Sequence, residues 1–77
     1  MTKTIYSEEH KRLCAMLVEA RNQLGLSQRE LGRRLDKYQP YVARYERGQR
    51  RIDVVELLRI AKALNIKASE VVAELEE

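Results

Sequence analysis

The sequence has few of the residues that build catalytic and metal sites. Its 77 residues include one histidine, one cysteine, three glycines and only two aspartates. A single cysteine excludes an intrachain disulfide and is compatible with a reducing compartment. The chain has no glycine-rich phosphate loop and no cluster of histidine, cysteine and aspartate. We therefore expect a protein that is not an enzyme and that binds no metal or other cofactor.

His10 and Cys14 are potential metal ligands that lie close together in the sequence. Their spacing of four residues places both side chains on one face of a helix. A zinc site needs three or four ligands, so this pair alone does not form one. We expect an exposed histidine and a partly buried cysteine.

Long hydrophobic runs are also missing. No apolar stretch approaches the roughly 18 residues of a membrane span, and residues 1–10 contain no hydrophobic segment typical of a signal peptide. Apolar residues nevertheless make up 44% of the chain and there is one proline, which excludes a disordered chain. We expect a single, mostly helical, cytoplasmic domain over residues 1–77, with its core between about residues 7 and 75.

Positive charge is concentrated in the middle of the chain. The net charge is +3, yet residues 27–52 carry eight lysines and arginines against three acidic residues. Seven of these eight cations are arginines, whose planar fork suits phosphates and guanine edges better than a lysine ammonium does. This segregation favours a nucleic-acid-binding segment, although a solvated charged surface explains the composition equally well.

Capping residues and apolar periodicity predict five helices. Ser7 caps the first helix and Gly25 ends it. The apolar stripe of this helix comprises Leu13, Leu17, Ala20 and Leu24. Ser27 and Glu30 form a capping box, which opens a short second helix.

The third helix is expected to begin near Gln39 and to stop at Gly48, with Pro40 in its first turn. Asp53 and Glu56 form a second capping box, which opens a fourth helix. The apolar face expected for this helix comprises Val54, Leu57, Leu58, Ala61 and Leu64. Asn65 ends it, and residues 68–75 form a fifth, short helix.

The second and third expected helices are three or four residues apart, which is the spacing of a helix-turn-helix motif. Gly32 lowers the stability of the second helix, and we expect it there because the third helix crosses close by. The angle between the two helices is expected to be filled by Leu31, Leu35, Val42 and Tyr45. The outward face of the third helix is expected to present Gln39, Pro40, Ala43, Arg44 and Arg47. An amide, two small groups and two guanidinium groups suit contacts with base edges and phosphates.

Three segments resemble the Cro/repressor-like, or XRE, helix-turn-helix family. They are Leu26–Leu31 (LSQREL), Tyr41–Gly48 (YVARYERG) and Leu57–Leu64 (LLRIAKAL), in the order and spacing of the family. The resemblance runs from about Leu13 to Val72. It implies an all-α fold, a compact five-helix lambda-repressor-like domain that binds double-stranded DNA with its third helix in the major groove.

The resemblance also implies roles for residues of the motif. Gln28 matches a position that contacts a phosphate and braces Gln39, and Gln39 matches a position that contacts an adenine. Pro40 and Arg44 match further base-contacting positions.

Outside the motif, the resemblance implies contacts with the DNA backbone for Arg47, Gln49 and Arg51. Arg21 and Glu46 match a pair that forms an ion bridge between the first and third helices in some members.

Three residues depart from the family pattern. Asp36 replaces the usual glycine of the turn, and we expect the turn to survive because aspartate tolerates a left-handed backbone better than most residues. Lys37 replaces an apolar residue, so its stem is expected to cover the core while its ammonium group reaches solvent. Pro40 cannot donate a hydrogen bond to a base, so any contact there is apolar, for instance with a thymine methyl.

Several further residues have two interpretations. Arg50 is a candidate phosphate contact beside Arg47 and Arg51, or simply a solvated cation. Tyr41 lies on the flank of the third helix, where its hydroxyl could bond a phosphate. Tyr45 is expected in the core with its hydroxyl at the edge. Arg33 and Arg34 either contact DNA or form salt bridges within the second helix.

The function predicted from these observations is a sequence-specific transcriptional regulator, a repressor that binds an inverted-repeat operator as a homodimer. The apolar residues Val71, Val72 and Leu75 either fold back onto the domain or form the dimer seam. The alternative function is an antitoxin or another protein-interaction module of the same fold. The lack of a disordered tail disfavours that alternative, since such proteins commonly use one.

Overall fold

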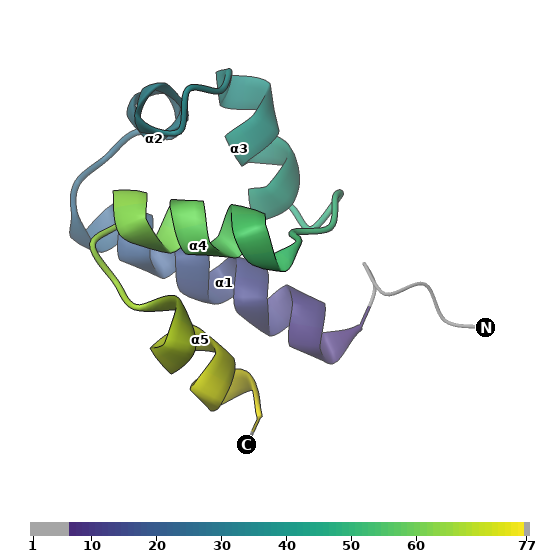
Figure 1. Cartoon of the computed structure of the whole chain (residues 1–77). Coiled ribbons are helices and arrows are strands. Elements are labelled where there is room, and N and C mark those ends of the chain that lie inside the picture. Colours follow the sequence, from purple (N-terminus) through teal and green to yellow (C-terminus); the bar gives the residue numbers. More distant parts are fainter. Residues whose placement is uncertain (1–6, 77) are drawn as a thin grey trace.

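The computed structural model describes residues 7–76, so residues 1–6 and 77 of the expected domain lie outside the described part. Five helices and no strand occupy this range (Figure 1). They are α1 (Glu8–Gln23), α2 (Gln28–Arg34), α3 (Gln39–Glu46), α4 (Val54–Ala63) and α5 (Ala68–Leu75). The five-helix, all-α prediction is confirmed. None of these helices is long and apolar enough to cross a membrane.

The predicted capping residues open three of the helices. The Ser7 hydroxyl accepts a hydrogen bond from the His10 amide. Ser27 and Asp53 each form a complete capping box with the glutamate three residues further on. Each box satisfies two backbone amides that the first turn of a helix would otherwise leave unpaired.

Four helices end in the same backbone reversal. The residues that follow their C-caps have positive φ angles: Gly25, Asp36, Gly48 and Asn65. In α2, for example, the Lys37 amide donates to the Gly32 carbonyl at 2.7 Å and the Asp36 amide to the Arg33 carbonyl at 3.1 Å. These bonds pair the last carbonyls of the helix. Asp36, with φ of 55°, therefore performs the turn in place of glycine, as predicted.

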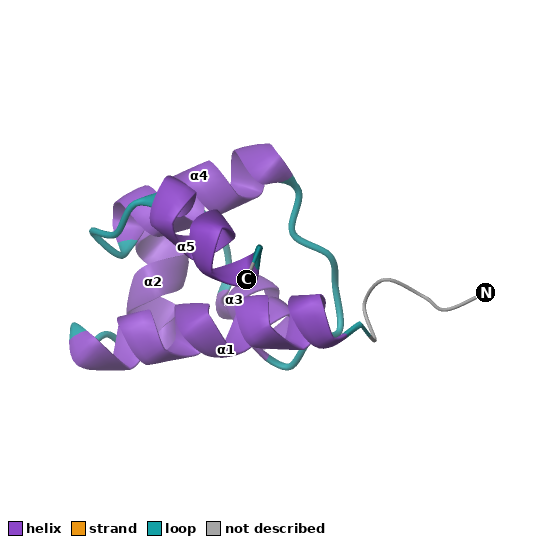
Figure 2. Cartoon of the chain, turned by 90° about the horizontal axis from the view of Figure 1, so that it is seen from below, coloured by secondary structure: helices purple, strands orange, loops and turns teal. Residues whose placement is uncertain are grey.

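The core takes residues from all five helices, and α5 packs against both α1 and α4 (Figure 2). Its largest fully buried side chains are Leu17, Leu31, Val42, Tyr45, Ile60 and Leu64. Val71 is also buried in this cluster, and Leu75 packs against it. The fifth helix therefore folds back onto the domain, which was one of the two arrangements left open.

Three details of the predicted packing are wrong. Val54 and Leu58 of α4 are exposed, because the helix turns the face carrying Leu57 and Ile60 toward the core instead. Leu24 is exposed as well, because it is the C-cap of α1 and lies past the buried stripe. The hydroxyl of Tyr45 does not reach the edge: it is buried and finds no partner among the described residues.

Gly32 is required by a close approach of the turn. A Cβ atom at this position would lie 3.0 Å from the Lys37 carbonyl oxygen and 3.3 Å from the Tyr38 carbonyl carbon. The nearest obstacle is the backbone of the turn, and the backbone nitrogen of Gln39, which opens α3, follows at 3.4 Å, so the close approach of α3 that the sequence predicts is found at its first residue. A side chain here would open the angle between α2 and α3.

Candidate nucleic-acid interface

The outer face of α3 is polar, cationic and accessible. Gln39, Pro40, Arg44 and Arg47 are all exposed, and Ala43 is half-buried between them. Val42 and Tyr45 occupy the opposite face and are fully buried. Because the buried face anchors α3 through its whole length, the outer face is held rigidly on the surface.

A chain of hydrogen bonds links this face to a largely covered ion pair. Arg21 donates to Glu46 from Nε at 2.6 Å and from Nη2 at 3.0 Å, and their side chains are 13% and 5% exposed. Gln28 Nε2 donates to Glu46 Oε1 at 2.8 Å. Gln39 Nε2 donates to Gln28 Oε1 at 3.2 Å. The structure thus contains the Arg21–Glu46 pair and the Gln28–Gln39 brace that the resemblance implies.

The carboxylate of Glu46 sets the direction of this chain. A carboxylate only accepts, so the amide nitrogen of Gln28 must face it and the amide oxygen of Gln28 must face Gln39. Gln39 then donates one of its two amide hydrogens inward. Its second hydrogen and its oxygen remain for a partner outside, which are the groups that bond adenine in the major groove.

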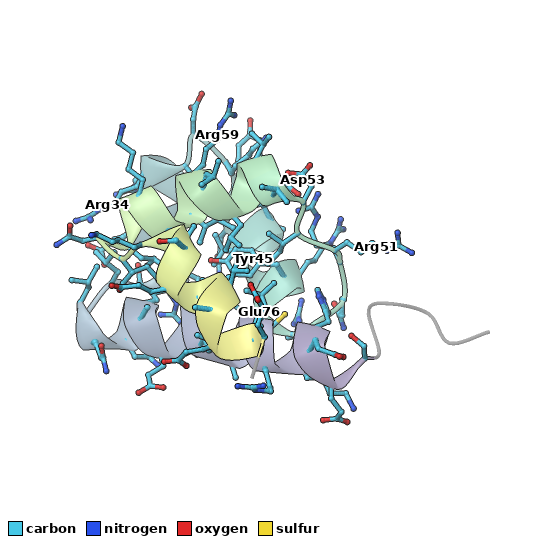
Figure 3. All side chains as sticks on the ribbon, turned by 60° about the horizontal axis from the view of Figure 1, so that its bottom comes forward. Arg34, Tyr45, Arg51, Asp53, Arg59 and Glu76 are labelled. Atoms are coloured by element: carbon cyan, nitrogen blue, oxygen red, sulfur yellow. The ribbon has the colours of Figure 1, made fainter. Side chains whose placement is uncertain are left out.

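The loop after α3 carries two further candidates, Gln49 and Arg51. The Gly48 amide donates to Tyr45 and the Gln49 amide donates to the Arg44 carbonyl at 2.9 Å, so the chain reverses at Gly48, where φ is 74°. Gln49 and Arg51 are exposed beyond this reversal. Arg51 extends from the loop away from the helices (Figure 3).

Tyr41 and Arg50 are both bound to Glu56 in a half-buried cluster. The Tyr41 hydroxyl and Arg50 Nη1 both donate to Glu56 Oε2 at 2.8 Å. The guanidinium carbon of Arg50 lies 4.7 Å from the centroid of the Tyr41 ring, which is a cation–π contact. This cluster ties α3 and the loop to the start of α4.

The electrostatics of the cluster keep Glu56 charged and Tyr41 protonated. Burial alone would raise the pKa of Glu56, but the Asp53 amide, Arg50 and Tyr41 together outweigh it and lower that pKa. Burial, followed by the bond to Glu56, raises the pKa of Tyr41 to about 12. The single hydroxyl proton of Tyr41 is therefore committed to Glu56, whereas Arg50 retains donors for other partners.

Arg34 serves the fold. Its Nη1 donates to the Ala63 carbonyl at 3.2 Å, at the C-terminal end of α4, which is a favourable place for a cation. The salt bridge considered for it within α2 does not form. Arg33 has no ion pair within residues 7–76.

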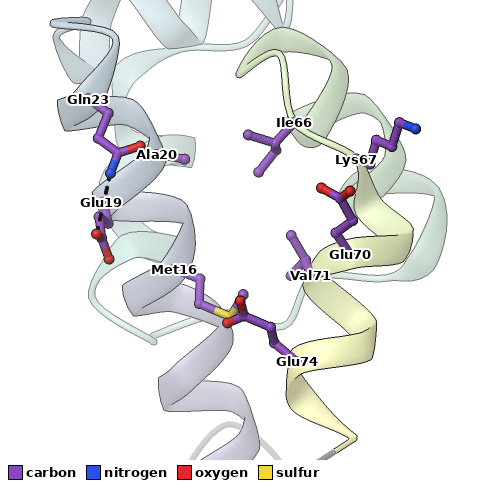
Figure 4. A pocket seen from close by; sticks show the side chains of 9 residues that line it. All are labelled: Met16, Glu19, Ala20, Gln23, Ile66, Lys67, Glu70, Val71 and Glu74. Atoms are coloured by element: carbon purple, nitrogen blue, oxygen red, sulfur yellow. Dashed lines mark hydrogen bonds between the residues drawn. The ribbon is translucent and has the colours of Figure 1, made fainter.

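A groove between α1 and α5 has the opposite character. Its floor is apolar, with Met16, Ala20, Ile66 and Val71, and its walls carry Glu19, Glu70 and Glu74 (Figure 4). Lys67 is the cation among the lining residues and points away from α1. The acidic walls make this groove a poor surface for nucleic acid, in contrast to the cationic α2–α3 side.

The described residues contain no group of three or more metal-ligating side chains. His10 Nε2 lies 3.6 Å from Cys14 Sγ, so the two share a helix face as expected, but His10 is half-buried and not exposed. Cys14 is more deeply buried than expected, and burial raises the pKa of its thiol.

The sequence predicts Glu56 only as part of a capping box and does not reveal that it also binds Tyr41 and Arg50. Its partners Tyr41 and Arg50 lie 15 and 6 residues away, so no local pattern reveals them. A cationic hollow beside α3, described below, was also missed. The spacing of four between Arg29 and Arg33 was a usable signal for it.

Comparisons with known proteins agree with this motif and this fold. A helix-turn-helix family model matches residues 17–71. An XRE-family like protein from Pseudomonas syringae pv. tomato is 32% identical, with a TM-score of 0.87 over 95% of this chain and 89% of that one. The restriction-modification controller protein C.AhdI from Aeromonas hydrophila is 34% identical, with a TM-score of 0.78 over 84% of this chain and 98% of that one.

The clp gene regulator ClgR from Corynebacterium glutamicum shares the fold at 24% identity, with a TM-score of 0.80 over 91% of this chain and 74% of that one. A comparison with curated proteins gives no match. The chain is a helix-turn-helix protein, and it belongs to the XRE family. It is accordingly a DNA-binding transcriptional regulator.

Proposed function

We propose that this regulator is a repressor that binds an inverted-repeat operator as a homodimer, with α3 inserted into the major groove. The observation that carries the proposal is the exposed face of α3, on which the amide of Gln39 is oriented through Gln28 by the largely covered Arg21–Glu46 pair. An amide held in one orientation can distinguish adenine from the other bases, whereas a freely rotating amide cannot.

The residues of this face divide into base and backbone contacts. Gln39 bonds an adenine, and Arg44, one turn past Pro40, bonds the O6 and N7 atoms of a guanine. Pro40 packs against a thymine methyl. The proposed phosphate contacts are Gln28, Arg47, Gln49 and Arg51, which lie at the start of α2 and after α3.

Tyr41 and Arg50 have a conditional part in the interface. Arg50 can bond a phosphate with the donors that Glu56 leaves free. Tyr41 can donate to a phosphate only by releasing Glu56, because it has one hydroxyl proton. We therefore propose Arg50 as a phosphate contact and Tyr41 as a weaker one.

Support for the homodimer comes from the first half of α4. Val54, Val55 and Leu58 are 74%, 56% and 55% exposed and lie on neighbouring positions of the helix. Large aliphatic side chains grouped on a surface favour association with a partner. This surface adjoins the loop that carries Arg51, so a two-fold contact through it would join the DNA-binding sides of two copies.

The proposed repressor role needs only that the protein occupies its operator. A dimer that covers an operator within a promoter excludes the transcription machinery without any further activity. Neighbours named as a gene regulator and a restriction-modification controller support regulation over the antitoxin alternative.

Selection of bound duplexes from a random pool tests the proposal. The dimer should enrich an inverted repeat with half-site centres about 10 base pairs apart, one helical turn. Sedimentation at micromolar concentration should give a dimer, and the selected site placed within a promoter should lower expression of a reporter. Recovery of one asymmetric half-site by a monomer would refute the dimer. Failure to enrich any sequence would favour the interaction module.

A further inference from the structure

A second cationic surface lies beside the start of α3, outside the residues assigned above to phosphate contacts. It is a hollow of about 300 Å³. Its lining residues are Arg29, Arg33, Lys37, Tyr38, Gln39 and Pro40. Three of the six are cations and none is acidic. Two of them, Gln39 and Pro40, are the residues proposed to contact bases, so the hollow continues directly into the base-contacting face.

The arginines of this hollow are not held by a close partner within the described part of the chain, although the charge of Arg33 makes a small contribution to lowering the pKa of Glu30. Arg29 and Arg33 are exposed and four residues apart, so they share the outer face of α2. Neither forms an ion pair or a side-chain hydrogen bond with another residue of the range 7–76, in contrast to Arg21 and Arg50. Glu30 lies between them in sequence, but its carboxylate is bound to the Ser27 amide at 2.9 Å.

Tyr38 and Lys37 complete the hollow. Tyr38 is 86% exposed and precedes α3 without capping it through its side chain. Its aromatic ring therefore contributes little to the packing of the domain. The ammonium group of Lys37 lies 5.5 Å from the centroid of the Tyr41 ring, which holds this cation at the edge of the recognition helix.

We propose that this hollow binds a backbone phosphate of the operator strand that flanks the bases contacted by Gln39 and Pro40. Arg29 and Arg33 supply charge-assisted hydrogen bonds, Lys37 adds a point charge, and the Tyr38 hydroxyl donates to the same phosphate group. The occupant is DNA because the lining is shared with the base-contacting face, so a duplex on α3 brings its backbone past this point. The inference rests on the proposed function, and it extends the footprint along α2.

Neutral methylphosphonate linkages, placed one at a time in the selected duplex, test this assignment. The test variant is Arg29→Gln combined with Arg33→Gln, and the matched control is Arg59→Gln combined with Lys62→Gln. The control also removes two positive charges, from exposed positions of α4. Glutamine keeps the helix propensity of all four positions, and the thermal midpoint checks that each variant is folded.

One methylphosphonate linkage per half-site should weaken binding by the wild type. The same linkage should weaken binding by Arg47→Ala and by Arg51→Ala to the same extent. The Arg29/Arg33 variant should be insensitive to that linkage and should lower the salt slope by about one to two units per subunit, with base preference unchanged. The Arg59/Lys62 variant should keep the salt slope of the wild type and should still lose affinity at that methylphosphonate linkage.

Equal losses of slope in the two variants would overturn the assignment, because bulk charge alone would then explain the effect. A linkage series that is the same for the wild type and the Arg29/Arg33 variant would overturn it as well. If the wild type shows no preference for the selected duplex over a scrambled one, the proposed function fails. The slope comparison on scrambled duplex would still decide whether α2 binds a phosphate.

Discussion

Two neighbouring tyrosines of α3 show how much the surroundings of one hydroxyl matter. The rings of Tyr41 and Tyr45 meet edge to face, with centroids 5.8 Å apart. The Tyr41 hydroxyl donates to Glu56, whereas the Tyr45 hydroxyl is buried without a partner among the described residues. Burial raises the pKa of Tyr45, so its hydroxyl stays neutral and the cost is that of an unpaired polar group.

Removal of the two hydroxyl groups should therefore have opposite effects. Tyr45→Phe should raise the free energy of unfolding by about 1 kcal/mol, because it removes a buried polar group that has no hydrogen-bond partner. Tyr41→Phe should lower it by about 1.5–3 kcal/mol, since it removes a hydrogen bond to a charged group. Urea denaturation of both variants measures the difference. A destabilised Tyr45→Phe would show that the buried hydroxyl has a partner, such as an ordered water molecule.

At the scale of helices and turns, local signals in the sequence predict most of what is found. The boxes at Ser27 and Asp53 and the reversals at Asp36 and Asn65 depend on residues within one turn, so the pattern contains them in full. The orientation of α4 could not be predicted in the same way. Its apolar residues cover more than one face, and only packing against the other helices decides which face is buried.

The candidate site also has features that local sequence signals predict and features that depend on packing between elements. The outward position of Gln39 and Arg44 follows from helical periodicity, and the structure shows both exposed. The capture of Tyr41 and Arg50 by Glu56 depends on how the loop folds against α4, which no periodicity reveals. Contacts with DNA remain predictions for every residue of the interface.

The Glu56 cluster links three elements and should give a pH-dependent contribution to stability. Because the pKa of Glu56 is lowered in the folded state, its contribution is present above the unfolded pKa of about 4.3 and is lost as pH falls through the folded value. Glu56→Gln should retain the capping box, which accepts glutamine, and lose this contribution. The wild type should thus unfold at higher urea concentration than Glu56→Gln near pH 7, with the gap closing as pH falls below the unfolded pKa. A gap that does not change with pH would mean that the charge of Glu56 stabilises nothing.

At the scale of the whole molecule, the two sides of the domain carry opposite charge. The α2–α3 side presents arginines, and the α1–α5 groove presents Glu19, Glu70 and Glu74. A duplex is therefore attracted to one side and repelled from the other, which orients the protein before close contact is made. The exposed aliphatic residues of α4 form a further surface, of apolar character.

Disruption of that aliphatic surface should separate dimerisation from base contact. Leu58→Glu places a charge among Val54 and Val55, and it should convert the dimer to a monomer because a carboxylate buried in an apolar seam is costly. Affinity for the inverted repeat should fall while half-site preference persists. Val72→Glu, on the exposed side of α5, is the control and should remain dimeric. The reverse outcome, in which only Val72→Glu dissociates the protein, would place the seam on α5.

The central claim is that α3 contacts base edges while the following loop contacts only the backbone. Its most direct test is the affinity of the wild type, Arg44→Ala and Arg51→Ala for cognate and scrambled duplexes at several salt concentrations. Arg44→Ala should lose about 1–3 kcal/mol on the cognate duplex and relax preference at one base position. Arg51→Ala should weaken both duplexes alike and lower the salt slope by about one unit per subunit. If Arg44→Ala instead weakens both duplexes equally and leaves base preference intact, Arg44 holds only a phosphate, and the claim is contradicted for the residue on which it most depends.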